Sequence, residues 1–207
     1  MALGDPYATL AQLKLRLTIT DTNDDAALTN ALAAASQDIE GAMGRQFNDA
    51  GSVTARVYYP DSLTVVEVDD FSTSTGLIYA QDFNNAGSYA TIVAAANYQL
   101  EPLNGIVDGS IGWPFNRIRM IQTWNPLWYT SIGDPRTSIQ VTARWGWTAV
   151  PAAVVEACLM LAEETFKMKD APYGVAGFSQ YGAVRVRENP KVMALLNRYD
   201  RNPIKIA

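Results

Sequence analysis

The sequence predicts an α+β fold, in which N- and C-terminal helices form a helical body and an antiparallel β module is inserted between them. Apolar residues recur at helical spacing near both ends of the 207-residue chain. The middle instead consists of short β-branched and aromatic runs separated by turn signals. We expect residues 1–48 and 149–207 to form the helical body and residues 49–148 to form the β module.

The first helix is expected over residues 9–17. Thr9 and Gln12 have the spacing of a capping box, in which each side chain caps the other's backbone. Leu10, Leu13 and Leu17 then repeat at helical intervals. The helix should stop in the β-branched run that follows it.

A second helix should start at Asn23 or Asp24, since either side chain can cap it. Its end is expected near Gly41 and Gly44. One apolar stripe is predicted to be its buried face, formed by Leu28, Leu32, Ala35, Ile39 and Met43. Further alanines crowd the rest of its surface, which permits close approach of another helix.

Seven strands are expected in the middle of the chain. Turn signals such as Pro-Asp, Asn-Gly and Asp-Gly separate them, as in a small sandwich or barrel. The predicted runs are 53–59, 63–68, 76–80, 89–93, 97–101, 117–122 and 139–145.

Two more helices are expected after the β module. Pro151 stands at a favoured position in the first turn of a helix that should end near Lys169. Its predicted apolar face comprises Val154, Val155, Cys158, Leu161, Ala162, Thr165 and Phe166. Pro190 opens the last helix, whose buried side should contain Val192, Leu195, Leu196 and Tyr199.

The residue types present exclude imidazole-based catalysis and leave carboxylate, lysine or tyrosine chemistry open but unsupported. The chain contains no histidine, the commonest general base and transition-metal ligand. Cys158 is the single cysteine, so the chain can form neither an internal disulfide nor a multi-thiolate metal site. We expect a buried thiol, no catalytic residue, no cofactor and no metal ion.

Paired carboxylates do not change that expectation. Asp24-Asp25 and Asp69-Asp70 are adjacent, and adjacent side chains on a helix or strand point in different directions. The remaining candidates, Asp61, Asp82, Asp108 and Asp134, lie in expected turns, where aspartate bonds its own backbone. A calcium site built from several loops stays open, although no spaced calcium-ligand loop is present.

Five tryptophans in and beside the second half of the β module support two readings. Buried, they form the core of a small β domain, which is the preferred interpretation because each ring must hide a large area. Exposed, they form a stacking platform for a sugar or another ligand. The alternative function is therefore a carbohydrate- or ligand-binding β module, with Trp113, Trp124 and Trp128 as its platform.

Charge is unevenly distributed. The net charge is −5, but residues 166–207 hold three acids and eight bases. The acidic remainder argues against a general nucleic-acid binder, whereas the basic end suits an acidic protein surface or a phosphate backbone. No segment approaches the length of a membrane span, and the N-terminus lacks signal-peptide features, so we expect a cytosolic site of synthesis and no membrane partner.

The segment from about 170 to 189 is expected to be an arm for assembly. Its glycines make ordering costly, so its aromatic side chains are better anchored by a partner than by their own fold. Tyr173, Phe178 and Tyr181 would be the anchors, and Arg185 and Arg187 would set the register. The glycine spacing does not match a phosphate-binding loop.

Both ends of the chain resemble the head–tail connector proteins of tailed bacteriophages, also called head-completion or adaptor proteins. The resemblance covers the helical half of the chain. It rests on the order of three motifs: an acidic helix start, a helix end of the form Gly-Arg-x-Phe, and a Val-Pro-x-x-Val-x-x-Ala helix that runs into a glycine-rich segment. The matching positions are Asp24, Asp25 and Leu28, then Gly44, Arg45 and Phe47, then Val150, Pro151, Val154 and Ala157.

This resemblance implies a structural virion protein, not an enzyme, at the head–tail junction of a particle assembled in the host cytoplasm. Such a protein forms a homo-oligomeric ring of about twelve copies between the portal protein and a tail or stopper protein. The ring extends the DNA channel and docks the next tail component. DNA would pass through the lumen without specific binding, which an acidic body favours because it repels phosphate.

Overall fold

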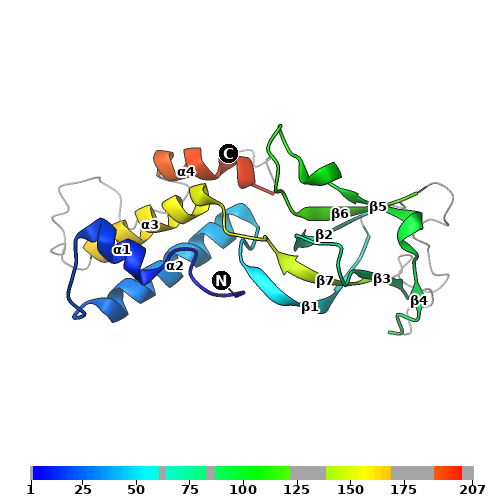
Figure 1. The fold of residues 1–207 in the computed structure, drawn as a ribbon, viewed down its shortest axis with the longest axis horizontal. Coiled ribbons are helices and arrows are strands. Elements are labelled where there is room, and N and C mark those ends of the chain that lie inside the picture. The colour runs from blue at the N-terminus through cyan, green and yellow to red at the C-terminus, as the bar shows by residue number, and fades with distance from the viewer. Residues whose placement is uncertain (1, 61–63, 83–86, 122–138, 169–188, 202–207) are drawn as a thin grey trace. The chain divides into compact units, whose positions relative to one another are not determined.

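The computed structural model describes residues 2–60, 64–82, 87–121, 139–168 and 189–201 (Figure 1). These residues form four α-helices and seven strands, so the predicted α+β fold is confirmed. The chain divides into two compact units. Leu3–Asn48 together with Ala149–Ala207 is called the helical unit below, and Asp49–Thr148 the β unit.

Helix α1 (Leu10–Leu17) begins as its sequence predicts. The backbone N–H of Gln12 donates to Thr9 Oγ1 (3.2 Å), and the N–H of Thr9 donates to Gln12 Oε1 (2.8 Å). This reciprocal capping box satisfies two N–H groups that a helix start otherwise leaves unpaired. The helix ends at Thr18, which adopts a left-handed conformation with φ of 57°.

Helix α2 (Asp25–Met43) buries the predicted apolar stripe. It ends at Gly44, whose φ of 61° is a left-handed conformation that glycine adopts without strain. Gly41 therefore lies inside the helix. The predicted capping role of Asp24 is only half right, because Asp24 occupies the N-cap position while its side chain makes no capping hydrogen bond.

Helix α3 (Ala152–Lys167) packs against α2 through small side chains. Ala35 and Ser36 of α2, and Ala157 and Cys158 of α3, are all buried, and Ser36 Oγ lies 3.4 Å from Cys158 Sγ. Small residues at a crossing let two helix backbones approach closely. Thr165, predicted to be on the buried face, is exposed, so that assignment was wrong.

Helix α4 (Pro190–Leu196) continues into the 3₁₀ turn η5 (Asn197–Tyr199). Asn189 caps α4, since its Oδ1 accepts from the N–H groups of Lys191 and Val192. The Nδ2 of Asn189 also donates to Glu164 Oε1 of α3 over 2.7 Å. The start of α4 is thereby fixed to the end of α3. Among the described residues, no helix has the length and apolar character to cross a bilayer.

The β unit contains a strand within or overlapping each of the seven predicted runs. The strands are β1 (Asp49–Tyr58), β2 (Val65–Phe71), β3 (Ile78–Gln81), β4 (Thr91–Ile92), β5 (Tyr98–Glu101), β6 (Phe115–Met120) and β7 (Ile139–Gly146). Two 3₁₀ turns, η1 (Ala95–Asn97) and η2 (Leu103–Gly105), flank β5.

These strands form one antiparallel sheet with β7 in a central position (Figure 1). The order is β4-β3-β7-β2-β6-β5, and β1 pairs with β7. β7 lies between β1 and β3 from Ile139 to Thr142 and reaches β2 at the pair Trp145–Phe71. The sheet thus has two halves joined near that pair: β1, β7, β3 and β4 in one, and β2, β6 and β5 in the other.

Buried and partly exposed residues alternate along the strands, and the buried ones form the core of the β unit. In β7 the residues Ile139, Val141, Ala143 and Trp145 are buried, while Gln140, Thr142 and Arg144 between them are partly exposed. Successive side chains on a strand point to opposite faces, so one face of β7 lines the core and the other faces outward.

Candidate assembly surfaces

The acidic start of α2 connects two helices. Lys14 Nζ donates to Asp25 Oδ1 over 2.6 Å and also to the backbone oxygen of Asp21. Leu28, the third position of the motif, is fully buried. Asp25 therefore fixes α1 against the start of α2, and its partner Lys14 was not identified from the sequence.

The Gly-Arg-x-Phe motif ends α2 and fills the core of the helical unit. Phe47 is fully buried between Tyr7 and Tyr199, with both pairs of ring centroids 5.6 Å apart in edge-to-face geometry. Its backbone N–H donates to the Tyr7 hydroxyl (3.1 Å), which in turn donates to Glu40 (2.7 Å). Burial raises the pKa of Tyr7, so the phenol stays neutral. Phe47 thus joins the N-terminal segment to the C-terminal 3₁₀ turn.

The third motif forms the start of α3. Pro151 is the N-cap residue, and its carbonyl accepts from the N–H of Val154 (2.9 Å) and of Val155 (3.1 Å). Val154 and Ala157 are fully buried, and Val150 is partly buried. Val154 and Ala157 are therefore core positions, while Arg45 and Val150 stand at the ends of α2 and α3.

The arm lies outside the described residues. This holds for Tyr173, Phe178, Tyr181, Arg185 and Arg187, so their assignment as partner contacts stays a prediction.

Three of the five tryptophans are core residues. Trp145 and Trp147 are buried, and the indole of Trp113 packs on that of Trp147 with centroids 5.2 Å apart. Trp145 Nε1 donates to the carbonyl of Thr54 (2.9 Å). The preferred core interpretation is right for these three. Trp124 and Trp128 lie outside the described residues, and burial of Trp113 removes one ring from the proposed sugar platform.

The adjacent aspartates of β2 point to different partners. Asp69 Oδ2 accepts from Arg56 Nη1 (2.6 Å) and from the Tyr58 hydroxyl (2.8 Å). Asp70 is buried, and its Oδ2 accepts from Trp147 Nε1 (2.9 Å). The two carboxylates do not converge, as expected from their adjacency. Within the described part of the chain, no group of three or more His, Cys, Asp or Glu side chains could hold a metal ion.

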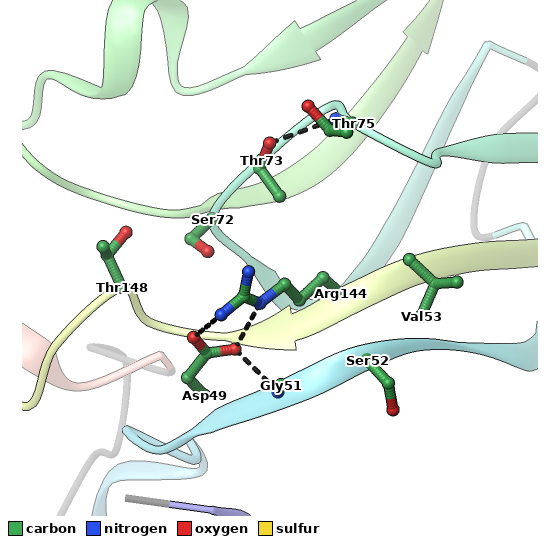
Figure 2. Close-up of a pocket in the computed structure, with 9 residues that line it drawn as sticks. All are labelled: Asp49, Gly51, Ser52, Val53, Ser72, Thr73, Thr75, Arg144 and Thr148. Atoms are coloured by element: carbon green, nitrogen blue, oxygen red, sulfur yellow. Dashed lines mark hydrogen bonds and ion pairs between the residues drawn. The ribbon is translucent and has the colours of Figure 1, made fainter.

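A pocket of about 410 Å³ opens within the β unit beside the start of β1 (Figure 2). Arg144 forms two hydrogen bonds with Asp49, one of them Nε to Oδ1 at 2.7 Å. These bonds hold the pKa of Asp49 below its ordinary value. The other lining side chains are Val53 and five hydroxyls, those of Ser52, Ser72, Thr73, Thr75 and Thr148. Because Asp49 is already paired, the pocket offers hydrogen bonds but neither a free base nor net charge.

The outer face of the β2-β6-β5 half is covered by paired charges. Arg117 pairs with Glu67 (2.6 Å), and Arg119 pairs with Glu101 on β5. These residues face one another across the ladders, since Glu67 and Glu101 are both in register with Arg117. The charges are largely satisfied within the face.

The outer face of the other half carries exposed apolar side chains instead. Val53 and Val57 of β1, Ile78 of β3 and Ile92 of β4 are all exposed. The ladder register places them on the same side as Gln140, Thr142 and Arg144 of β7. Apart from Arg144, which is paired with Asp49, this face is uncharged at the named positions.

Comparison with known families gives a match in the N-terminal part of the chain. Residues 7–103 match the family model described as phage gp6-like head-tail connector protein. No curated protein matches the chain.

Three solved structures share the fold over the whole chain at 20% sequence identity. A chain in the neck of an empty gene transfer agent particle, computed with C6 symmetry, has a TM-score of 0.61 and is 95% covered. One in the neck of the native particle, computed with C12 symmetry, has a TM-score of 0.55 and is 94% covered. One in the virion of the native particle has a TM-score of 0.51 and is 95% covered.

Proposed function

We propose that this chain is a structural virion protein of the head–tail junction, because residues 7–103 match the model of the phage gp6-like head-tail connector family. It forms a ring between portal and tail, extends the DNA channel and docks the next tail component. Its role is mechanical and not enzymatic.

The observation that carries this proposal is the family match together with what the matched residues do. The match includes α1, α2 and the first strands of the β unit. Within it, Leu28 and Phe47 are fully buried and Gly44 ends α2. These motif residues determine a helix end and a core, so they act through the shape they give the chain, which suits a protein whose function is its surface.

Ring formation is supported by the fold and by surface left over on α2. The similar chains come from particle necks computed with C12 and C6 symmetry. On α2, the buried alanines pack within the chain, whereas Ala27, Ala34 and Gly41 remain exposed. These three small residues are seven positions apart, so they lie near one side of the helix. We assign this side to contact with a neighbouring copy.

The arm at about 170–189 completes the proposal. Tyr173, Phe178 and Tyr181 dock on an adjacent protein, the portal or a tail component, while Arg185 and Arg187 pair with its acidic groups. The net negative charge of the rest of the chain suits a channel through which DNA slides without tight binding.

The test replaces residues 171–187 with a Gly/Ser linker of equal length. Equal length matters because Asn189 must still reach Glu164. The variant should fold and melt like the parent, yet yield filled heads that carry no tails in electron micrographs. A matched control is a linker of the same composition that keeps the three aromatics and two arginines. Tailed, infectious particles from the first variant would contradict the assignment of the arm.

A second measurement tests the ring itself. Particles assembled with the full chain should show a closed ring of this protein below the portal in an electron cryomicroscopy reconstruction. Recovery of the chain as a monomer, at high concentration and in particle fractions alike, would refute the proposed function.

A further inference from the structure

We propose that neighbouring copies in the ring join through their β units, with the free edge of β1 in one copy beside the free edge of β4 in the next. The inference rests on the proposed ring and adds the surface by which its members recognise one another. The partner at this surface is a second copy of the same chain.

Both edges are open as far as the described residues go. Among the described residues, β1 pairs only with β7, although it is ten residues long. β4 pairs only with β3, on the opposite side of the same half of the sheet. An edge strand presents unpaired N–H and C=O groups and is a ready template for another strand.

The edge of β1 lacks the charges that usually protect such a strand. Arg56 is the charged residue in its middle, but its guanidinium lies 4.7 Å from the Trp145 ring and 2.6 Å from Asp69. Asp49, at the start of β1, is held by Arg144. Because both side chains are held by these contacts, neither opposes pairing of another strand with this edge.

Strand directions fit a continuous sheet. β1 is antiparallel to β7, β7 to β3, and β3 to β4. Within one copy β1 and β4 therefore run in opposite directions. A copy displaced sideways presents its β4 antiparallel to the β1 of its neighbour, which is a favourable pairing.

The register identifies which side chains would meet. One row crosses the four strands, since Val57 is opposite Gln140, Gln140 opposite Ala80, and Ala80 opposite Ile92. Within it Gln140 is half-buried and Ala80 is buried. The two ends of this row are apolar and exposed, Val57 by 51% and Ile92 by 65%. In a continued sheet, Ile92 of one copy lies beside Val57 of the next, and both are removed from water.

The contact is of the type that makes a ring. Its two sides are different surfaces of the same chain, so it is heterologous, and repeating it by rotation closes a circle. β4 contains only two residues, Thr91 and Ile92, so this contact buries far less than the roughly 800 Å² per partner of a stable pair. It therefore acts together with the helical unit and does not hold copies together alone.

The other outer face of the β unit is a poorer candidate. Its arginines are already paired with Glu67 and Glu101, and burying those pairs in an interface would cost desolvation. The row from Val57 to Ile92 contains no charged side chain and carries no such cost.

Disulfide trapping in assembled rings of the full chain tests this arrangement. Cys158 is fully buried, which leaves a clean background for new surface thiols. Three double variants, each combining Ile92→Cys with Val57→Cys, Ala55→Cys or Val53→Cys, sample the possible staggers. We expect one of them to give a ladder of covalent oligomers on oxidation. Each single variant should give dimers at most, since a ladder requires two thiols per chain.

A charge variant supplies a second readout with a matched control. Ile92→Lys places an unpaired ammonium at the contact and should reduce the ring fraction roughly tenfold. Ile111→Lys, at an isoleucine that is 82% exposed and lies outside the strands, should leave it unchanged. Thermal melting checks that both variants are folded.

The outcomes separate the two proposals. Rings that form normally, give no ladder in any double variant and tolerate Ile92→Lys would overturn this inference and leave the proposed function intact. Loss of rings in Val57→Lys but not in Ile92→Lys would mean that the β1 edge meets a surface other than β4, which also overturns it. Failure of the parent chain to form rings in any setting would refute both.

Discussion

The indole of Trp147 donates a hydrogen bond of 2.9 Å from Nε1 to Oδ2 of Asp70, and both side chains are buried. Trp147 also packs on Trp113, which precedes β6, so this one bond orients an indole pair inside the β unit. A buried carboxylate is tolerated where donors satisfy it, and loss of a hydrogen bond to a buried polar group is costly.

Asp70→Ala should therefore lower the free energy of unfolding by roughly 1–3 kcal/mol. The neighbouring residue provides the control. Asp69→Ala removes a more exposed carboxylate that is paired with Arg56, and such pairs contribute about 0–1 kcal/mol. Urea denaturation followed by tryptophan fluorescence measures both. Equal losses for the two variants would show that burial of Asp70 does not matter.

Phe47→Ala should be among the most damaging single substitutions in the helical unit. It removes the central ring of the Tyr7–Phe47–Tyr199 stack, and truncation of a buried phenylalanine costs about 3–5 kcal/mol. The C-terminal turn loses its contact at the same time. Hydrogen exchange should consequently accelerate at Arg201, whose N–H donates to the carbonyl of Met43. Unchanged protection at Arg201 would show that the C-terminal turn stays in place without the aromatic stack.

Two glycines of α2 should respond in opposite directions to alanine. Gly44→Ala forces a side chain into a left-handed conformation and should destabilise the chain by roughly 1 kcal/mol. Gly41→Ala lies in an exposed helical turn with nothing within 4 Å of the added methyl, and should stabilise by roughly 0.5–1 kcal/mol. Thermal melting of the unassembled chain compares them. A shift of both melting temperatures in the same direction would contradict this prediction.

Asp49 should make the β unit sensitive to acid. The hydrogen bonds from Arg144 hold the pKa of Asp49 below its unfolded value of about 3.9. A carboxyl with a lower pKa in the folded state stabilises the fold above that unfolded value, and this contribution is lost as pH falls through the folded pKa. Asp49→Asn should therefore flatten the stability profile below about pH 5 in urea titrations at low salt. Arg144→Gln removes the donor instead of the carboxylate and should flatten the profile in the same way.

Local signals explain what the sequence predicted well. The capping box of Thr9 and Gln12, the stripe of α2 and the seven β runs each depend on neighbours a few residues apart, and each is found in the structure. The prediction for Asp24 was only partly right: local pattern gave its N-cap position, but its side chain makes no capping hydrogen bond. The partner of the adjacent Asp25 is Lys14 in another helix, which local pattern does not reveal.

Strand order could not be predicted in this way. The central position of β7, the last strand in the sequence, depends on pairing with β1 and β3, which are far apart in the chain. Alternation predicts which side of a strand is buried but not which strand lies beside it. The edge positions of β1 and β4 follow from that strand order, so the sequence alone does not predict them.

The hydrogen bond between Asn189 and Glu164 fixes the start of α4 beside the end of α3, so both ends of the arm are anchored at one place. Helix α3 ends at Lys167 and α4 begins at Pro190, and this bond keeps the two helix ends side by side. About twenty residues at roughly 3.4 Å each, going out and back, can reach no farther than about 35 Å from that point. Any protein that the arm grips must lie inside this radius, so the length of the loop limits how far the next layer of the particle can stand from α3.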